Sequence, residues 1–348
     1  METKIIRIDK DNYFNKILNY PAKVIQEGGL VAFPTETVYG LGANALEEEA
    51  IYKIFEAKGR PADNPLIVHI ANINELDMLV EEYSGLVKKV ISKFWPGPLT
   101  IIFKKKDIVP AVVTSGLDTI AVRMPSSKIA RKFIEMAGVP IAAPSANLSG
   151  KPSPTAVLHV IDDLTGKVDC IIDGGNCEVG LESTVLDLSA DIPTILRPGC
   201  VTYEELQEVL PDIVFDSALS DSTITPKSPG MKYVHYSPDA EVYILECDII
   251  NKEERLEINR IVKERFKDKK VGFMGSNQFI KKFNDYFTVA LGSKENLSEI
   301  ASNLFDALRL FDERNVDIII SESFKNEGIG IAIMNRLLKS AGYKKIKL

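Results

Sequence analysis

KGRPADNPL, residues 58–66, separates a helix from a strand and indicates the fold class of the chain. The preceding residues 45–57 carry apolar side chains at helical spacing, which predicts an amphipathic helix. Gly59 and Pro61 end any helical run. The following residues 65–70, PLIVHI, form a short apolar run that is typical of a buried strand. A helix, a loop and a buried strand in close succession indicate an α/β protein.

The same alternation extends on both sides of this stretch, to about residue 200. Further strands are predicted over residues 29–34, 99–104, 119–124, 139–143, 170–173, 183–187 and 194–197, and further helices over 86–94 and 128–137. Gly40 and Gly42 place the residues after the first strand in a loop, either as a turn or as backbone that approaches a ligand. Several connections are too short for a parallel crossover, so the predicted sheet has mixed strand directions.

The pattern becomes regular after residue 241. Four strand–helix pairs follow, over residues 242–245 and 253–266, 271–274 and 278–283, 287–291 and 298–314, and 316–320 and 329–340. This repetition predicts a second, smaller domain with a doubly wound α/β fold.

A segment of different composition joins the two parts. Residues 217–228 are rich in Ser, Thr, Asp and Pro and lack apolar periodicity, which is typical of a linker. Residues 228–238, SPGMKYVHYSP, then place two Tyr, one His and one Lys within five positions, so we expect this half to dock on the first domain. The predicted division is a first domain over 1–212, a linker over 213–240 and a C-terminal domain over 241–348.

Composition and charge exclude several classes of protein. The 348 residues are 45% hydrophobic and 26% charged, which is ordinary for a soluble globular protein, and no apolar run approaches the length of a membrane span. The N-terminus lacks the apolar core of a signal peptide, so we expect a cytoplasmic protein.

Residues 241–348 carry 19 Lys and Arg against 17 Asp and Glu, while the remaining residues carry 23 against 32. A broad nucleic-acid surface needs the opposite sign, so the motif cations are expected to bind a small anion in a cleft.

Familiar catalytic and metal-binding motifs are missing from the sequence. The four cysteines form no CxxC pair and are expected to be small buried side chains in a reducing compartment. Three dispersed histidines disfavour a zinc site. No GxxxxGK[ST] loop and no GxSxG turn occurs, which disfavours a Walker-type ATPase and a serine hydrolase.

Three motifs remain as candidates for a binding site. Lys58 and Arg60 are suited to phosphate oxygens or to the charge of a leaving pyrophosphate, although a solvated basic turn is an alternative. Thr35 and Thr37 follow a strand and either bind a polar ligand or cap a turn. The third motif contains Ser145 and Asn147. Their side chains point the same way from an extended segment, so they either face a nucleotide together or form an Asx-type turn.

A charged residue inside an apolar strand is a further candidate. Arg123 lies in TIAVRM and needs an anionic partner, either an internal carboxylate or the carboxylate of a substrate, and we favour the substrate. His69 ends the strand PLIVHI, where a histidine is more often a hydrogen-bonded core residue than a functional one. Ser183 and Arg197 add a hydroxyl and a cation at loop positions.

FPTETVYGLGA, KGRPADNPL, RMP, PSANLSG, LESTVLD and LRPG occur in this order, and together they resemble the YrdC-like threonylcarbamoyl-adenylate synthases. The linker SPGMKYVHYSP and the ending GIGIAIMNRL make the chain similar to the long, two-domain type of this family. The resemblance implies a twisted mixed-sheet YrdC-like catalytic domain, a linker that forms a lid over the active site, and a smaller Rossmann-like C-terminal domain.

The same resemblance implies a reaction. The family joins L-threonine, bicarbonate and ATP into threonylcarbamoyl-AMP and releases pyrophosphate, which is the chemistry of a nucleotidyltransferase. Mg²⁺ is expected as the counter-ion of ATP rather than in a cage of protein ligands. A downstream transferase complex then uses the product to modify the tRNA adenosine next to the anticodon, and direct tRNA binding is not expected to be the primary role.

Residue roles also follow from the resemblance. The expected threonine pocket contains Thr37, His69, Arg123 and Ser183. The expected catalytic residues are Lys58, Arg60, Ser145 and Asn147. The expected nucleotide shell contains Arg60, Asn64, Thr119, Ala143, Ser145, Ser153 and Arg197, with Tyr233 and Tyr236 of the linker closing over the nucleotide.

Three other interpretations stay open on the sequence alone. An RNA-binding module is disfavoured by the acidic first domain. A carbamoyl-phosphate adenylating module, as in hydrogenase maturation proteins, lacks here the acylphosphatase and zinc-finger segments that accompany it. The C-terminal domain could bind a nucleotide by itself, but it carries no phosphate-loop motif, so we expect a regulatory or lid-supporting role.

Overall fold

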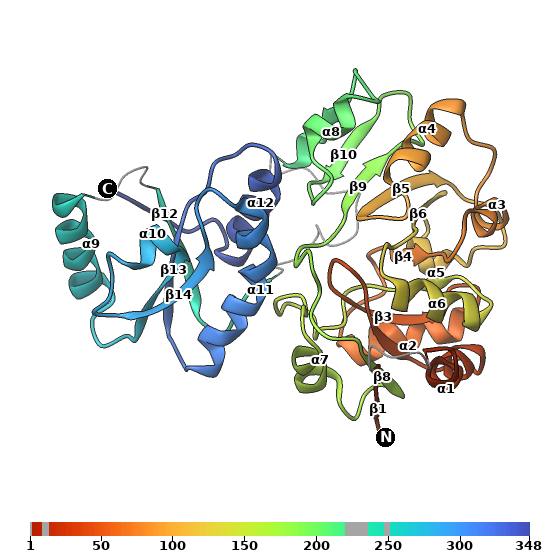
Figure 1. Cartoon of the computed structure of the whole chain (residues 1–348), viewed down its shortest axis with the longest axis horizontal. Helices are drawn as coiled ribbons and strands as arrows, with labels where there is room; N and C mark the ends of the chain where they lie inside the picture. Colours follow the sequence, from red (N-terminus) through yellow and green to blue (C-terminus); the bar gives the residue numbers. More distant parts are fainter. Residues whose placement is uncertain (1, 9–13, 220–235, 247–250) are drawn as a thin grey trace. The chain divides into compact units, whose positions relative to one another are not determined.

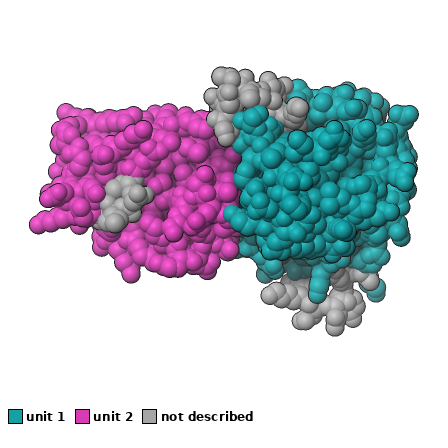
Figure 2. All heavy atoms as spheres, turned by 90° about the horizontal axis from the view of Figure 1, so that it is seen from above, with its two compact units in different colours: residues 1–149, 153–232 teal, residues 150–152, 233–348 magenta. Residues whose placement is uncertain are grey.

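The computed structural model describes residues 2–8, 14–219, 236–246 and 251–348. The chain divides into two compact units (Figure 2). The first unit contains residues 1–149 and 153–232, and the second contains residues 150–152 and 233–348. Three residues from the middle of the first unit's sequence thus belong to the second unit.

The first unit is built on an eleven-stranded mixed sheet in the order β1-β8-β2-β3-β7-β4-β6-β5-β9-β10-β11 (Figure 1). Parallel pairs such as β4 with β6 occur beside antiparallel pairs such as β2 with β3. The strands are β1 (Lys4–Arg7), β2 (Val31–Pro34), β3 (Tyr39–Asn44), β4 (Ile67–His69), β5 (Leu99–Lys104), β6 (Thr119–Arg123), β7 (Ile141–Ala142), β8 (Cys170–Asp173), β9 (Thr184–Asp187), β10 (Thr194–Arg197) and β11 (Val214–Phe215). The predicted mixed sheet is therefore confirmed.

Two large apolar cores and one smaller cluster cover the faces of this sheet. Val31 and Phe33 belong to one core and Ala32 to the other, which is the alternation of a strand buried on both faces. The first core contains α1 (Phe14–Gln26) and α6 (Lys128–Ala137). The second contains α2 (Glu48–Lys58), α3 (Leu76–Leu79), α4 (Gly85–Phe94), α5 (Ala111–Thr114), α7 (Val157–Leu164) and α8 (Tyr203–Gln207). Two 3₁₀ turns, η1 (Ile73–Glu75) and η2 (Ser217–Leu219), complete the described part of this unit.

The second unit has a five-stranded, all-parallel sheet in the order β14-β13-β15-β12-β16. The strands are β12 (Glu241–Glu246), β13 (Val271–Ser276), β14 (Phe287–Gly292), β15 (Ile318–Glu322) and β16 (Lys345–Lys347). The helices are α9 (Lys252–Arg265), α10 (Asn277–Ile280), α11 (Leu297–Glu313) and α12 (Ile329–Ser340). The four predicted strand–helix pairs are all present, and β16 adds a fifth strand that the sequence pattern did not predict.

The segment after β2 differs from its predicted loop, because it is the strand β3 of a hairpin. Gly42 permits close packing here: a Cβ at this position would lie 2.7 Å from Cγ2 of Ile141 on β7. Glycine therefore marks the approach of neighbouring side chains rather than a turn. The sequence pattern also missed β1 and α1.

Two further expectations, on membrane-spanning helices and on the cysteines, can be compared with the described residues. Among them, no helix combines the length and the apolar character needed to cross a membrane. Cys170 and Cys177 are buried free thiols, as predicted, whereas Cys200 is only half-buried. Burial raises the pKa of the Cys170 thiol to about 12.

Candidate active site

The turn between β2 and β3 holds two threonine hydroxyls in a fixed chain of hydrogen bonds. Thr35 Oγ1 accepts from the backbone N–H groups of Thr37 and Val38 at 3.2 and 3.3 Å and donates to the Val38 carbonyl at 2.6 Å. Its contact with Thr37 Oγ1, at 2.8 Å, is therefore one in which Thr37 donates. Thr37 Oγ1 in turn accepts from Arg123 Nη1 at 2.8 Å. The turn therefore combines both alternatives: Thr35 caps its backbone, and Thr37 binds the polar side chain of Arg123.

Arg123, the last residue of β6, has an internal carboxylate partner. Its Nη2 lies 2.7 Å from Glu36 Oε1, and the side chains of Arg123 and Glu36 are only 4% and 6% exposed. Burial opposes ionisation of Glu36, but the Arg123 charge and a hydrogen bond from the Ser126 amide outweigh it, so the pKa of Glu36 lies below its ordinary value. The pairing of Arg123 with a substrate carboxylate, which the sequence favoured, stays a prediction.

His69 lies beside Arg123 in the parallel register of β4 and β6, so both side chains share one face of the sheet. Burial, followed by the positive charge of Arg123, lowers the pKa of His69 to about 3. Its Nδ1 is 3.2 Å from the Ile67 carbonyl. His69 therefore adds a neutral imidazole next to a buried guanidinium.

Ser183 and Arg197 are in direct contact. Arg197 Nε and Nη2 donate to the Ser183 carbonyl at 3.2 and 3.0 Å, and Nη2 also reaches Ser183 Oγ at 3.2 Å. The Ser183 hydroxyl is a further 2.8 Å from Thr100 Oγ1. Sequence reasoning assigned Ser183 to the threonine pocket and Arg197 to the nucleotide shell, and these two residues are in contact.

Lys58 joins the first motif to the third. It is the last residue of α2, which Gly59 ends at φ 62°, a left-handed conformation that glycine adopts without strain. Lys58 Nζ donates to the carbonyl oxygens of Ser145 at 2.5 Å and Asn147 at 2.6 Å, and the Ser149 amide donates to the Lys58 carbonyl at 3.0 Å. Because Lys58 is buried, the alternative of a solvated turn is wrong for this residue.

The side chains of the same loops are also ordered. Ser145 Oγ donates to Asn147 Oδ1 at 2.5 Å, and Asn147 Nδ2 donates to the Leu148 carbonyl at 2.8 Å. Arg60 Nη2 donates to the carbonyl of the buried Asn64 at 3.3 Å. The sequence therefore placed the motif around residue 58 and the motif around residue 145 correctly in one cluster, which we call the lysine cluster and define as Lys58, Ser145 and Asn147.

The three other candidates for the nucleotide shell are spread along the sheet. The Ala143 amide donates to the Ile67 carbonyl at 2.9 Å, next to the lysine cluster. Thr119 begins β6 and Arg123 ends it, so their Cα atoms are about 13 Å apart at the rise of a strand. Ser153 Oγ donates to the buried Glu182 Oε1 at 2.5 Å.

The structure describes one of the two predicted lid residues. Tyr233 lies outside the described residues. Tyr236 is buried in the second unit, where its ring stacks on Phe305 of α11 with centroids 5.1 Å apart and lies 5.8 Å from the Arg336 guanidinium. Its contact with a nucleotide stays a prediction.

Sequence reasoning missed three contributors to this site. Glu36 was noted in its motif but given no role, although a buried arginine demands an anion and Glu36 stands between the two threonines. Glu182 and Thr100 hold Ser153 and Ser183, and only the motif LEST, which contains Glu182, offered a signal for either.

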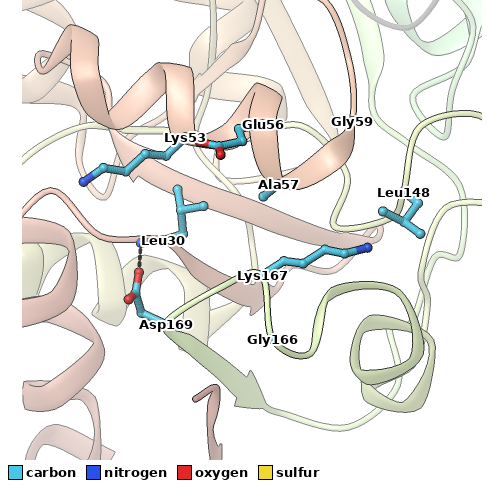
Figure 3. A pocket seen from close by; sticks show the side chains of 9 residues that line it. All are labelled: Leu30, Lys53, Glu56, Ala57, Gly59, Leu148, Gly166, Lys167 and Asp169. Atoms are coloured by element: carbon cyan, nitrogen blue, oxygen red, sulfur yellow. Dashed lines mark hydrogen bonds between the residues drawn. The ribbon is translucent and has the colours of Figure 1, made fainter. Parts of the chain in front are cut away.

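A cavity of about 480 Å³ lies beside the lysine cluster without including it (Figure 3). Gly59 and Leu148, the neighbours of Lys58 and Asn147, line it. Its two lysines donate to backbone carbonyls, Lys53 to Gly28 at 2.7 Å and Lys167 to Asp163 at 3.2 Å. No residue with a predicted role lines this cavity.

The fold and the site together define an α/β protein whose mixed sheet carries buried cations, hydroxyls and an amide at neighbouring strand ends. Residues 23–199 match the family described as "Telomere recombination" (Sua5, YciO and YrdC), and residues 201–342 match the "Threonylcarbamoyl-AMP synthase, C-terminal domain". The chain is 49% identical to the threonylcarbamoyl-AMP synthase of Pyrococcus abyssi, over 94% of each chain, and 47% identical to that of Bacillus subtilis over 94% and 93%.

The solved structures agree with the sequence relatives. The crystal structure of P. abyssi Sua5 complexed with L-threonine matches over 100% of both chains, with a TM-score of 0.91 and 47% identity. A putative threonylcarbamoyl-AMP synthase of Methanocaldococcus jannaschii, 38% identical, matches over 98% of its own length but only 59% of this chain. The chain belongs to the threonylcarbamoyl-AMP synthase family, in its long two-domain form.

Proposed function

We propose that this enzyme is a nucleotidyltransferase that makes threonylcarbamoyl-AMP from L-threonine, bicarbonate and ATP and releases pyrophosphate. The observation that carries the proposal is the presence in one unit of both the lysine cluster and the buried Arg123–Glu36–Thr37 group. The L-threonine bound by the similar P. abyssi protein supports the substrate. The product would serve a transferase complex that modifies tRNA adenosine next to the anticodon.

The reaction needs positioned charges rather than a covalent nucleophile. The threonine amine adds to bicarbonate and water leaves, which gives an N-carboxylate. A carboxylate oxygen then attacks the α-phosphorus of ATP, and the bond to the bridging oxygen of pyrophosphate breaks. Every reactant carries negative charge, so the enzyme must collect anions and stabilise charge on the phosphates.

We assign the phosphate side of this reaction to the lysine cluster and its neighbours. The Lys58 ammonium is held between two backbone carbonyls, which fixes its position for the phosphate groups. The half-exposed Arg60 offers a planar guanidinium, suited to two phosphate oxygens at once. Asn64, Thr119, Ala143, Ser153 and Arg197 would complete the nucleotide shell. Mg²⁺ would enter with the triphosphate, whose oxygens it prefers as ligands.

We assign the amino-acid side to the group around Arg123. Thr37 and Ser183 present hydroxyls, and Arg123 presents a guanidinium to the threonine carboxylate. Glu36 keeps that guanidinium in place before the substrate arrives. The neutral His69 adds polarity without a second positive charge that would compete with Arg123.

Pyrophosphate release tests the proposal. ATP turnover is measured with and without L-threonine and with and without bicarbonate, and the products are analysed by mass spectrometry. The expected result is release that depends on both, with a threonylcarbamoyl-AMP mass. Turnover that is indifferent to threonine would overturn the proposal, and carbamoyl phosphate and RNA would then be the next ligands to test.

A further inference from the structure

The loop that follows the lysine cluster is divided between the two units. Ser149 and Ser153 belong to the first unit, whereas the three residues between them, Gly150, Lys151 and Pro152, belong to the second (Figure 2). We call these three residues the inserted tripeptide. The second unit therefore contains a piece of the loop that carries candidate catalytic residues.

Two hydrogen bonds hold the inserted tripeptide within the second unit. The Ser237 amide donates to the Gly150 carbonyl at 2.9 Å, and Arg309 Nη2 of α11 donates to the Pro152 carbonyl at 2.6 Å. Arg309 is 8% exposed and Pro152 is buried, so this bond from a charged donor is shielded from water and correspondingly strong.

The same helix supports the chain on the other side of the linker. Asp312, one turn after Arg309 on α11, accepts from the Asp239 amide at 2.8 Å. The end of α11 thus binds two backbone segments that are far apart in sequence, the inserted tripeptide and the entry to β12. This double contact marks the end of α11 as an anchor for backbone.

Both ends of the loop are fixed in the candidate active site. On one side, the Ser149 amide binds the Lys58 carbonyl at 3.0 Å, and the Asn147 carbonyl binds Lys58 Nζ at 2.6 Å. On the other side, Ser153 Oγ binds Glu182 at 2.5 Å. Because only three residues separate these anchors, a displacement of the tripeptide must change the backbone that binds Lys58.

We propose that Arg309 is a positioning residue for the phosphate side of the site: by holding the Pro152 carbonyl, it fixes the loop whose carbonyls bind Lys58. The second unit thereby contributes to catalysis through the loop's backbone. This inference rests on the proposed function for its kinetic consequence, but not for its structural one.

The test uses the full-length chain with R309M, which keeps the length of the side chain and removes its donors. R309K, which keeps a charged donor, tests rescue. The matched control is R314M, at the exposed end of the same helix.

We expect R309M to lower kcat/KM for ATP roughly tenfold, since small errors in position are costly for such reactions. The Kd of L-threonine should change less than twofold, R309K should recover part of the loss, and R314M should match the wild type.

A second measurement is independent of activity. Hydrogen exchange of peptides covering residues 145–153 should be faster in R309M, since the Ser149 amide loses part of its protection. Unchanged exchange in this loop would overturn the inference, and so would an equal loss of ATP turnover and threonine binding, which indicates general unfolding. If R309M does not fold, R309K is used instead, and the inference is tested by its hydrogen exchange over residues 145–153 and by its ATP turnover compared with its threonine binding. A wild-type chain without threonine-dependent turnover would refute the proposed function, whereas the exchange result would still test the anchor.

Discussion

Arg123 on β6 and Lys58 at the end of α2 are two buried cations of the same unit, and they are held in different ways. Two side chains hold Arg123, namely the carboxylate of Glu36 and the hydroxyl of Thr37, and its Nε also donates to the Gly97 carbonyl at 3.3 Å. Backbone carbonyls of residues 145 and 147 hold Lys58. A substitution can delete the two side-chain partners of Arg123, whereas the two backbone carbonyls that bind Lys58 depend on the path of the loop. The comparison indicates that side-chain chemistry sets the amino-acid side, while loop conformation sets the phosphate side.

The largest expected effect is the removal of the Lys58 charge. K58M should lower kcat/KM for pyrophosphate release by about 10²- to 10³-fold, because a positioned charge at the phosphates stabilises the transition state. Steady-state pyrophosphate release measures the effect. K53M is the matched control on the same helix, since Lys53 is exposed and donates to the Gly28 carbonyl. Equal activity of K58M and K53M would remove Lys58 from the mechanism.

Breaking the Arg123 pair should affect stability and threonine binding together. E36Q leaves the buried guanidinium without its carboxylate, which should lower the free energy of unfolding by about 3 kcal/mol. Urea denaturation measures this loss, and calorimetry should show weaker threonine binding. If E36Q binds threonine as tightly as the wild type, Glu36 does not pre-organise Arg123.

The neutral His69 predicts a pH dependence of stability. Its pKa is about 3 in the folded chain and about 6.5 in the unfolded chain, so only the unfolded chain takes up this proton as the pH falls from 6.5. Stability should therefore decrease by about 1 kcal/mol per pH unit below pH 6. H69N should flatten this slope in urea denaturation between pH 5 and 6.5.

The pH range of this slope distinguishes the titration of His69 from that of Glu36. The lowered pKa of Glu36 also makes stability fall on acidification, but only below the ordinary carboxyl range near pH 4.5. A slope that persists in H69N between pH 5 and 6.5 would show that another group titrates there.

The smallest expected effect concerns the hairpin turn. T35V removes the hydroxyl that accepts two amides and donates to the Val38 carbonyl. It should lower the free energy of unfolding by about 1 kcal/mol and change threonine affinity only slightly, because Thr37 keeps its contact with Arg123. Thermal unfolding and threonine titration measure the two quantities. A tenfold loss of affinity would instead place Thr35 at the ligand.

Elements whose pattern is local could be predicted from the sequence. The strand at 99–104 and the helices at 128–137 and 329–340 have the predicted bounds, because apolar spacing and end signals lie within each segment. The strand β3 was missed because its glycines serve packing against residues about a hundred positions away.

The site was predictable in its residue types more than in its contacts. Arg123 signalled a buried anion, but Glu36 is 87 positions earlier in the chain, and no local pattern links the two. The contact between Lys58 and the loop at 145–147 is likewise long-range, and only the co-occurrence of the motifs suggested it. The anchoring of residues 150–152 left no signal in composition or spacing.

The inserted tripeptide means that the polypeptide passes between its two units three times, after residues 149, 152 and 232. A chain shortened to end within the linker would keep the tripeptide but lose Ser237 and Arg309, which bind it. Loss of the C-terminal unit would therefore also remove the described donors to two backbone carbonyls, of Gly150 and Pro152, in the middle of the N-terminal sequence.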